Sequence, residues 1–257
     1  MNLYLADGGG RFKDTEKGLI EKGFTEGQMF QDVNILQSFF YCNDYTQKVV
    51  IPNCRDFMLD SGAFTFMSSN KSTVDWDEYI SKYAKFIKAN EKIDKFFELD
   101  IDSVVGYEKV KEYRKRLEDL TGKKCIPVWH KSRGKEEFLK MCEEYPYVAI
   151  GGIVTKEITR EQYPFFPWFI NEAHKRKAKI HGLGFTNLEG LKKYHFDSVD
   201  STSWTTGNRF GAIYQFNGET MIKHSKKEGQ RLAQSRTAAI HNFTEWVKFQ
   251  KYADKNL

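Results

Sequence analysis

Carboxylate, imidazole and paired glycine residues recur in this sequence directly after short apolar runs. Asp60 follows the run Phe57–Leu59, and His130 follows Cys125–Trp129. The full set is Asp60, Asp100, His130, Gly151-Gly152, His181 with Gly182 and Gly184, and Asp197 with Asp200. Carboxylates and histidines are the usual acids, bases and nucleophiles of enzymes. Two facing carboxylates can also divide the work of glycosyl transfer, one attacking the anomeric carbon while the other handles the leaving-group proton.

Asp60 is the strongest candidate for a catalytic acid/base. An Asp at the end of a strand can simply cap the next helix. Asp60, however, is followed by Ser61-Gly62-Ala63, a tight turn of small residues. Such a turn lets a ligand approach the backbone closely. We therefore predict that Asp60 takes part in catalysis and that Ser61 and Gly62 contact the ligand.

The other positions each keep two interpretations. Either Asp100 or Asp102 could cap a helix, and His130 could be a histidine of the core. The later glycine pairs fit tight packing and ligand approach equally well. Asp197 and Asp200 are three residues apart, so on a strand they face opposite sides. Only one of the two can point into a shared site.

Eight short runs rich in β-branched and aromatic residues are expected to be strands. They are Leu3–Ala6, Val33–Tyr41, Phe57–Leu59, Lys95–Leu99, Cys125–Trp129, Val148–Ile150, Ala178–Leu183 and Phe196–Val199. Helical patterns lie between most of them: Trp76–Ala89 after the capping-type Ser72 and Thr73, Tyr107–Leu120, Lys135–Tyr145 and a helix opened by Asn187. The Gly8–Gly10 run is expected to begin a long loop. This alternation predicts a (β/α)8 TIM barrel, in which active sites lie at the carboxyl ends of the strands.

The pattern changes after the eighth strand. Gly211–Phe216 and Glu219–His224 flank Asn217-Gly218, which is typical of a type I′ hairpin turn. A basic amphipathic helix is expected from about Lys226 to Tyr252. We find no repeat or linker, so we expect one domain over residues 1–257, with the barrel in about 1–204 and an appendage in about 205–257.

The composition is typical of one large cytoplasmic domain. A length of 257 residues matches one barrel. The four cysteines form no Cys-x-x-Cys pair and lie near no histidine at metal-ligand spacing, which predicts reduced thiols and no bound metal. The N-terminus does not resemble a signal peptide, and no run is long enough to span a membrane. The net charge of +5 permits a polyanionic partner without requiring one.

Several of these motifs occur together in a defined order. They are Leu59-Asp60-Ser61-Gly62-Ala63-Phe64, Phe97-Glu98-Leu99-Asp100, Ala149-Ile150-Gly151-Gly152, His181-Gly182-Leu183-Gly184, Phe196-Asp197-Ser198-Val199-Asp200 and Gly207-Asn208-Arg209-Phe210-Gly211. In this series the chain resembles the tRNA-guanine transglycosylase superfamily over most of its length. The ordered set, rather than any single motif, carries the resemblance.

The resemblance implies an enzyme that exchanges a base on a nucleotide. Asp200 would be the nucleophile on C1′, and Asp60 would protonate the departing guanine and deprotonate the incoming base. Asp100 would bind the amino and imino edge of the base, which suits a carboxylate that accepts two hydrogen bonds. Gly151 and Gly152 would present backbone groups to the carbonyl edge.

The resemblance also implies contacts to the two faces of the base. Phe64 would stack on one face, and His181, next to Gly182, would lie near the other. His130 stands where the family has an amide side chain, so its role in substrate binding stays open.

The sequence departs from the tRNA enzymes in ways that favour a DNA-modifying branch. The tRNA enzymes carry a Cys/His zinc cluster after the barrel, but no cysteine here follows Cys142, so we expect no zinc and no other cofactor. Ser201–Trp204 is more similar to the DpdA-type transglycosylases of phages and bacteria, which replace guanine in DNA with a 7-deazaguanine such as a preQ0-like base. The expected partners are a 7-deazaguanine base and DNA that is single-stranded or has its base flipped out. Trp204 and Arg209 are expected to contact the nucleic acid.

Three other functions fit the same residues. The chain could act on tRNA instead of DNA. It could be a barrel enzyme for a small phosphorylated metabolite, because glycines after strands six to eight often form phosphate sites. It could also be a DNA-binding barrel without catalysis, in which case DNA binding would survive the loss of Asp200.

Overall fold

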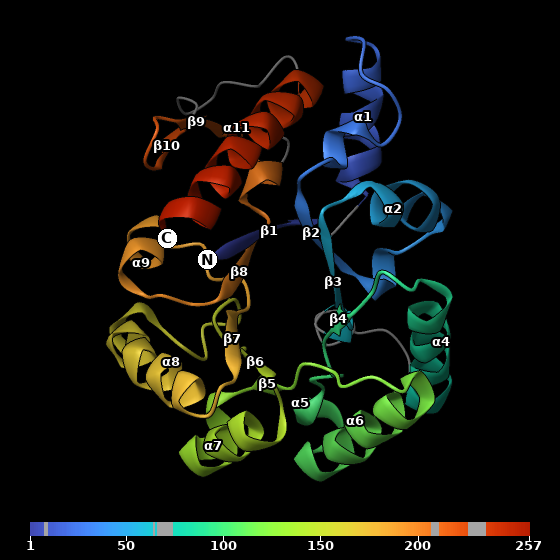
Figure 1. Cartoon of the computed structure of the whole chain (residues 1–257), viewed down its shortest axis with the longest axis vertical. Helices are drawn as coiled ribbons and strands as arrows, with labels where there is room; N and C mark the ends of the chain where they lie inside the picture. The colour runs from blue at the N-terminus through green and yellow to red at the C-terminus, as the bar shows by residue number, and fades with distance from the viewer. Residues whose placement is uncertain (8–9, 64, 66–73, 207–210, 226–234) are drawn as a thin grey trace.

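Eight parallel strands form the centre of the protein in a computed structural model that describes residues 1–7, 10–63, 65, 74–206, 211–225 and 235–257. The strands are β1 (Asn2–Asp7), β2 (Asn34–Ser38), β3 (Asp56–Asp60), β4 (Lys95–Phe96), β5 (Val128–Trp129), β6 (Tyr147–Ile150), β7 (Lys179–Gly182) and β8 (Ser198–Ser201). They pair in the order β4-β3-β2-β1-β8-β7-β6-β5. Figure 1 shows them in a ring surrounded by helices. The predicted TIM barrel is confirmed.

The ring closes between β4 and β5 through a parallel bridge between Phe97 and Ile126. Ile126 N donates to the Phe96 carbonyl at 2.8 Å, and Glu98 N donates to the Ile126 carbonyl at 3.0 Å. The next residue, Pro127, has no N–H to donate to a neighbouring strand. Pairing at this seam is therefore short, and β5 is shorter than the sequence predicted.

Inward-pointing side chains fill the barrel. The apolar part of this interior consists of Tyr4, Ala6, Leu36, Met58, Phe97, Ile126, Val128 and Ala149, all of them buried. Side chains alternate along a strand, so the next inward positions are Asp60 after Met58 and His130 after Val128. The apolar filling therefore ends in a layer of polar side chains at the carboxyl ends of the strands.

Helices cover the outside of the ring (Figure 1). They are α1 (Arg11–Ile20), α2 (Ile51–Asn53), α4 (Trp76–Ala89), α5 (Asp102–Val105), α6 (Tyr107–Thr121), α7 (Gly134–Glu144), α8 (Phe166–Lys175), α9 (Leu188–Lys193) and α11 (Ser235–Asn256). α4 has the predicted bounds, and its N-cap is Asp75, which accepts from Glu78 N at 2.9 Å. Asn187 caps α9 as predicted, accepting from Gly190 N at 2.8 Å.

The segment after Gly10 is the helix α1, and the prediction of a long loop there was wrong. α1 buries Phe12, Thr15, Glu16 and Leu19. These spacings of three and four place the four residues on one helix face. Two of the four are polar, which hides the apolar period in the sequence.

The C-terminal hairpin is present, but its turn differs from the predicted one. β9 (Ile213–Phe216) and β10 (Met221–His224) are antiparallel, and Phe216 pairs with Met221. Residues 217–220 therefore connect the strands, which is longer than a two-residue type I′ turn. The Asn217 side chain stabilises the longer turn by accepting from Glu219 N at 3.0 Å and Thr220 N at 2.9 Å.

α11 lies in the outer layer beside α1 and packs against β1 (Figure 1). Gln250 Nε2 donates to the Leu3 carbonyl at 2.6 Å, and Gln250 Oε1 accepts from Asn34 N at 3.1 Å. Phe243 and Trp246 are buried in the same core as the barrel strands. No helix within the described residues is long and apolar enough to cross a membrane.

Candidate active site

Asp60 ends β3 and lies at the mouth of the barrel, paired in register with Ser38 of β2. Its Oδ2 accepts a hydrogen bond from Gly62 N at 3.1 Å. Gly62 has a φ of +80°, and a Cβ there would lie 2.9 Å from Ser38 Oγ. Since a side chain fits neither this conformation nor this space, the glycine is needed to bring a backbone N–H to the carboxylate.

Burial raises the pKa of the Asp60 carboxyl to about 7, and the negative charge of Asp100 adds to this effect. The Gly62 N–H stabilises the charged form and opposes the increase, while the charge of Asp200 raises the pKa further. A carboxyl with such a pKa can take up and release a proton near neutral pH. Asp100 and Asp200 act on Asp60 because Asp60 ends β3, Asp100 follows β4 and Asp200 lies on β8, all at the carboxyl ends of the strands.

Asp200 points into this mouth from β8 and is buried. Its Oδ1 accepts from Gly184 N at 2.6 Å and lies 3.3 Å from His181 Nε2. His181 Nδ1 bonds in turn to the Ser198 hydroxyl at 2.5 Å, which also bonds to the Tyr147 hydroxyl. Within the described residues, Asp200 Oδ2 has no hydrogen-bond donor. A carboxylate held through one oxygen can present the other to an electrophilic carbon.

Asp197 faces away from the mouth, as the three-residue spacing predicted. It precedes β8, and its Oδ2 accepts from Ile180 N at 2.8 Å and pairs with His174 at 2.9 Å. Of the two candidates, only Asp200 therefore lies with Asp60.

A second polar group lies on the β4–β6 side of the mouth. His130 Nε2 lies 3.2 Å from Asp100 Oδ2, and His130 Nδ1 lies 3.1 Å from Glu157 Oε2. Burial lowers the pKa of His130, but the hydrogen bond and charge of Asp100 outweigh burial, and with the bond to Glu157 they raise the pKa to about 9. With this pKa, His130 carries a proton at neutral pH and pairs with Asp100 at the edge of the mouth.

The glycine pair after β6 makes room for this group. A Cβ on Gly151 would lie 2.7 Å from His130 Cε1, and a Cβ on Gly152 would lie 2.8 Å from Glu157 Oε2. Gly151 N already donates to the Trp129 carbonyl at 2.9 Å. The prediction that both glycines present backbone groups to a ligand is thus wrong for the Gly151 N–H.

Sequence reasoning missed Glu157 and Arg133. Glu157 lies in the irregular segment after β6, where no periodicity marks a residue as inward. Arg133 pairs with Glu98 Oε1 at 2.7 Å, and its Nε donates to Asp102 Oδ2 at 2.7 Å. Asp102 is thus paired with an arginine, which leaves Asp100 as the carboxylate that pairs with His130.

The polar group opens into a cavity of about 730 Å³. This volume is within the ~300–1,000 Å³ typical of small-molecule sites. The lining side chains include Asp100, Asp102, Tyr107, Lys111, His130, Arg133, Glu137 and Glu157. The cavity therefore offers carboxylates and cations together, which suits a polar ligand with both donors and acceptors.

Three side chains that were expected at the ligand are fully buried instead: Ser61, His181 and Trp204. Trp204 stacks on Phe12 at 5.1 Å between ring centroids and donates to the Ala6 carbonyl at 2.8 Å. The predicted nucleic-acid contact at Trp204 is therefore wrong. His181 lies beneath the mouth and supports Asp200 rather than facing a base.

Gly182 also has a packing role in place of the predicted ligand contact. A Cβ there would lie 3.1 Å from Phe185 Cβ. It is the next glycine, Gly184, whose N–H reaches Asp200. Phe64 and Arg209, predicted to contact the base and the nucleic acid, lie outside the described residues. In the described part of the chain, no three His, Cys, Asp or Glu side chains are grouped as a metal site requires.

No known family model matches this chain, and no curated protein matches it. Among solved structures, the chain is similar to a candidate fructose-1,6-biphosphate aldolase from Coccidioides immitis. The TM-score is 0.55 at 11% identity, and the match covers 99% of this chain and 90% of that one. This likeness shows the barrel fold and extends over the whole chain.

Proposed function

We propose that this protein is a glycosyltransferase that exchanges guanine in DNA for a 7-deazaguanine through a covalent intermediate on Asp200. One arrangement carries the proposal: Asp60 ends β3 and Asp200 lies on β8 in register with the inward-pointing Tyr4, so both carboxyls lie at the carboxyl ends of the barrel strands, and Asp200 is held through Oδ1 alone. A carboxyl that transfers a proton, together with a second carboxyl that attacks the anomeric carbon, is the pair that glycosyl transfer with retention requires.

In the first half of the reaction, Asp200 Oδ2 bonds to C1′ as the bond from C1′ to the guanine ring nitrogen breaks. The base leaves with the electron pair and takes the proton of Asp60. In the second half, the incoming base gives its ring N–H proton to Asp60. Its nitrogen then displaces Asp200 from C1′, which restores both carboxyls.

The charged pair beside the two catalytic carboxyls provides the contacts for the base. Asp100 lies 3.2 Å from His130 Nε2 and can accept hydrogen bonds from an amino and an imino group. Gly152 N has no partner among the described residues, so it remains as a donor for a carbonyl oxygen. This donor and acceptor pattern complements the polar edge of guanine and of 7-deazaguanine bases.

A second candidate is a barrel enzyme for a small metabolite, and the fold likeness favours it. The candidate aldolase matches this chain almost from end to end. The cavity of about 730 Å³ lined by Asp100, His130 and Glu157 could also hold a small polar substrate, with His130 as the group that transfers a proton. This enzyme would act on a free metabolite and show no base exchange.

Incubation of the full chain with labelled guanine or a labelled 7-deazaguanine separates these functions. Double-stranded DNA, single-stranded DNA and tRNA are offered in parallel, and cleavage of fructose-1,6-bisphosphate is followed separately. We expect label in DNA, lost in Asp200→Asn and kept in Asp197→Asn, the same change on the opposite face of the strand. Label in tRNA alone would overturn the DNA assignment. Metabolite cleavage without label in any nucleic acid would establish the second candidate.

A covalent intermediate gives an independent check. An adduct between the protein and DNA should survive denaturation in the wild type and in Asp197→Asn, and be absent from Asp200→Asn. An adduct that persists in Asp200→Asn would overturn the role of Asp200 as nucleophile.

A further inference from the structure

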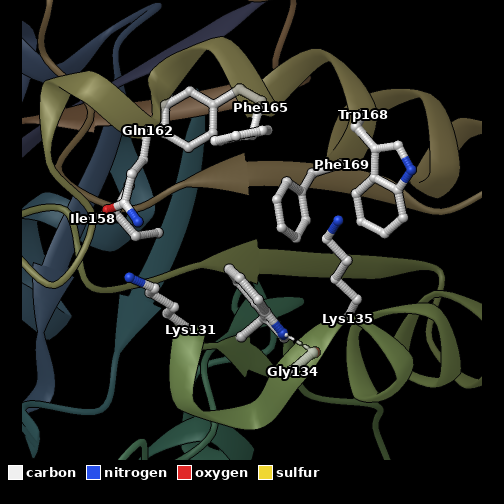
Figure 2. A pocket seen from close by; sticks show the side chains of 10 residues that line it. Lys131, Gly134, Lys135, Ile158, Gln162, Phe165, Trp168 and Phe169 are labelled. Carbon is white, nitrogen blue, oxygen red and sulfur yellow. Dashed lines mark hydrogen bonds between the residues drawn. The ribbon is translucent and has the colours of Figure 1, made fainter.

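A second cavity of about 250 Å³ lies beside the active site, between two helical segments. One wall comes from η4 (Lys131–Arg133) and α7, and the other from η5 (Arg160–Phe165) and α8. Figure 2 shows the two walls facing each other, with aromatic side chains on the α8 side. The apolar lining consists of Trp129, Ile158, Phe165, Phe166, Trp168 and Phe169.

Part of this aromatic lining is open to solvent. Phe165 is 60% exposed, and Trp168 is half-buried. The Trp129 Nε1–H is already bonded to the Gly134 carbonyl at 2.7 Å, so this indole offers the cavity its ring rather than a donor. Exposed aromatic faces around a slot are the features on which nucleic-acid bases stack.

Two lysines provide the charge of the cavity. The Lys135 amine extends from α7 toward Trp168 and Phe169, and the Lys131 amine, from η4, lines the other end of the cavity (Figure 2). Lys135 Nζ lies 5.0 Å from the centre of the Trp168 ring. No carboxylate lines the cavity, and in the described residues neither amine has a carboxylate within ion-pair distance. The cavity therefore combines an aromatic wall with two positive charges that no carboxylate of the described residues neutralises.

Gln162 adds a directed hydrogen-bond donor. Its Oε1 accepts from Thr159 N at 3.0 Å, in the capping box of η5. This bond fixes the amide, and its NH2 group points toward the cavity (Figure 2). A fixed NH2 group can donate to a ring nitrogen or carbonyl of a heterocycle, which a plain hydrocarbon ring does not offer.

The cavity adjoins the active site along the chain. Lys131 follows His130, and Ile158 follows Glu157, so two segments carry a residue of the active site and a residue of the second cavity next to each other. The two cavities therefore lie on either side of the same two segments of the chain.

We propose that this cavity is a second nucleotide site, in which one base lies between the aromatic side chains and its phosphate contacts Lys131 and Lys135. A volume of about 250 Å³ is below the ~300–1,000 Å³ of sites for drug-sized ligands. One ring system therefore fits, with the sugar and phosphate at the rim. The inference rests on the proposed nucleic-acid substrate for the source of the nucleotide, which would be a neighbour of the reacting one.

Tryptophan fluorescence tests this site without any turnover, because Trp129 and Trp168 line it. The Asp200→Asn protein is titrated with deoxyadenosine monophosphate, deoxyadenosine, inorganic phosphate and a short single-stranded oligonucleotide. We expect saturable quenching by the nucleotide and the oligonucleotide, and much weaker quenching by the nucleoside. Lys131→Ala with Lys135→Ala should weaken nucleotide binding about tenfold. Lys140→Ala, an exposed lysine of α7 outside the lining, is the matched control.

Further variants test the stacking and the donor. Trp168→Ala should remove most of the quenching, and Gln162→Glu should weaken binding while its oxygen still caps η5. Equal binding of nucleoside and nucleotide, or quenching that the double lysine variant leaves unchanged, would overturn the proposal. If the oligonucleotide binds more tightly than the mononucleotide, the nucleotide in this cavity comes from a nucleic-acid strand. If the two bind equally, the cavity takes a free nucleotide. Base exchange is measured in a separate assay. The chain can therefore bind a nucleotide here without exchanging bases, or exchange bases without binding a nucleotide here.

Discussion

The raised pKa of the half-buried Asp60 leads to a prediction about stability that does not depend on the substrate. The folded carboxyl has a pKa of about 7 against an ordinary value of 3.8. At ~1.4 kcal/mol for each pH unit, the ionised carboxyl costs the folded state roughly 4 kcal/mol above pH 7. Two effects reduce the stability gained when asparagine replaces this carboxylate. Water at the mouth already solvates part of the charge, and the Gly62 N–H loses its charged acceptor. We therefore expect Asp60→Asn to be about 2 kcal/mol more stable than the wild type at pH 8.

The raised pKa also determines how the stability of the folded protein changes with pH. Below about pH 4 the carboxyl is protonated in both the folded and the unfolded chain, so it contributes no difference. Between about pH 4 and 7 only the unfolded chain loses the proton, and the stability of the wild type falls as the pH rises through this window. The stability gained by Asp60→Asn should therefore grow from pH 5 to pH 8.

Urea unfolding at pH 5 and pH 8 measures the effect, with base exchange measured on the same samples. Asp32→Asn is the control, because Asp32 is exposed and asparagine tolerates its φ of +62°. We expect Asp60→Asn to gain stability and lose activity, as replacement of a strained catalytic group commonly does. An Asp60→Asn protein that is no more stable than the wild type at pH 8, or a gain that does not grow with pH, would refute the assignment of a buried acid at this position.

Three further predictions concern the residues around Asp60. Glu157→Gln should lower the pKa of His130 from about 9, because it removes a hydrogen-bonded anion. NMR titration of the imidazole measures this pKa, with the exposed Glu161→Gln as the control. An unchanged pKa would contradict the pairing of Glu157 with His130. Gly152→Ala should lower the free energy of unfolding in urea by about 1–3 kcal/mol, because the residue has a φ of +79°. Gly122 also has a positive φ but open space around it, so Gly122→Ala should lower the free energy of unfolding by less. An equal loss in the two variants would exclude a clash with Glu157. Trp204→Ala should lower stability by about 3–5 kcal/mol and leave oligonucleotide affinity unchanged in the folded protein, as a buried side chain requires.

Much of the architecture was predictable from local patterns in the sequence. The short apolar runs, each followed by acidic residues, a histidine or glycines, placed Asp60, Asp100, His130 and one of Asp197 and Asp200 on one rim. The three-residue spacing places Asp197 and Asp200 on opposite faces of their strand. Apolar spacing alone predicted the bounds of α4. These features are local, because they depend on the alternation of side chains along a strand or around a helix.

The partners of these residues were decided by the tertiary structure. Glu157 reaches His130 from an irregular segment that has no periodicity, and Trp204 is buried because α1 brings Phe12 against it. Gly184, rather than Gly182, donates to Asp200 because of the path of the chain after β7. Such contacts join residues far apart in sequence or in irregular backbone, and the pKa of Asp60 depends on charges from β4 and β8 together. The sequence by itself therefore determined which residues end the strands, whereas only the folded ring determined which of them reach the mouth, with their burial, partners and protonation.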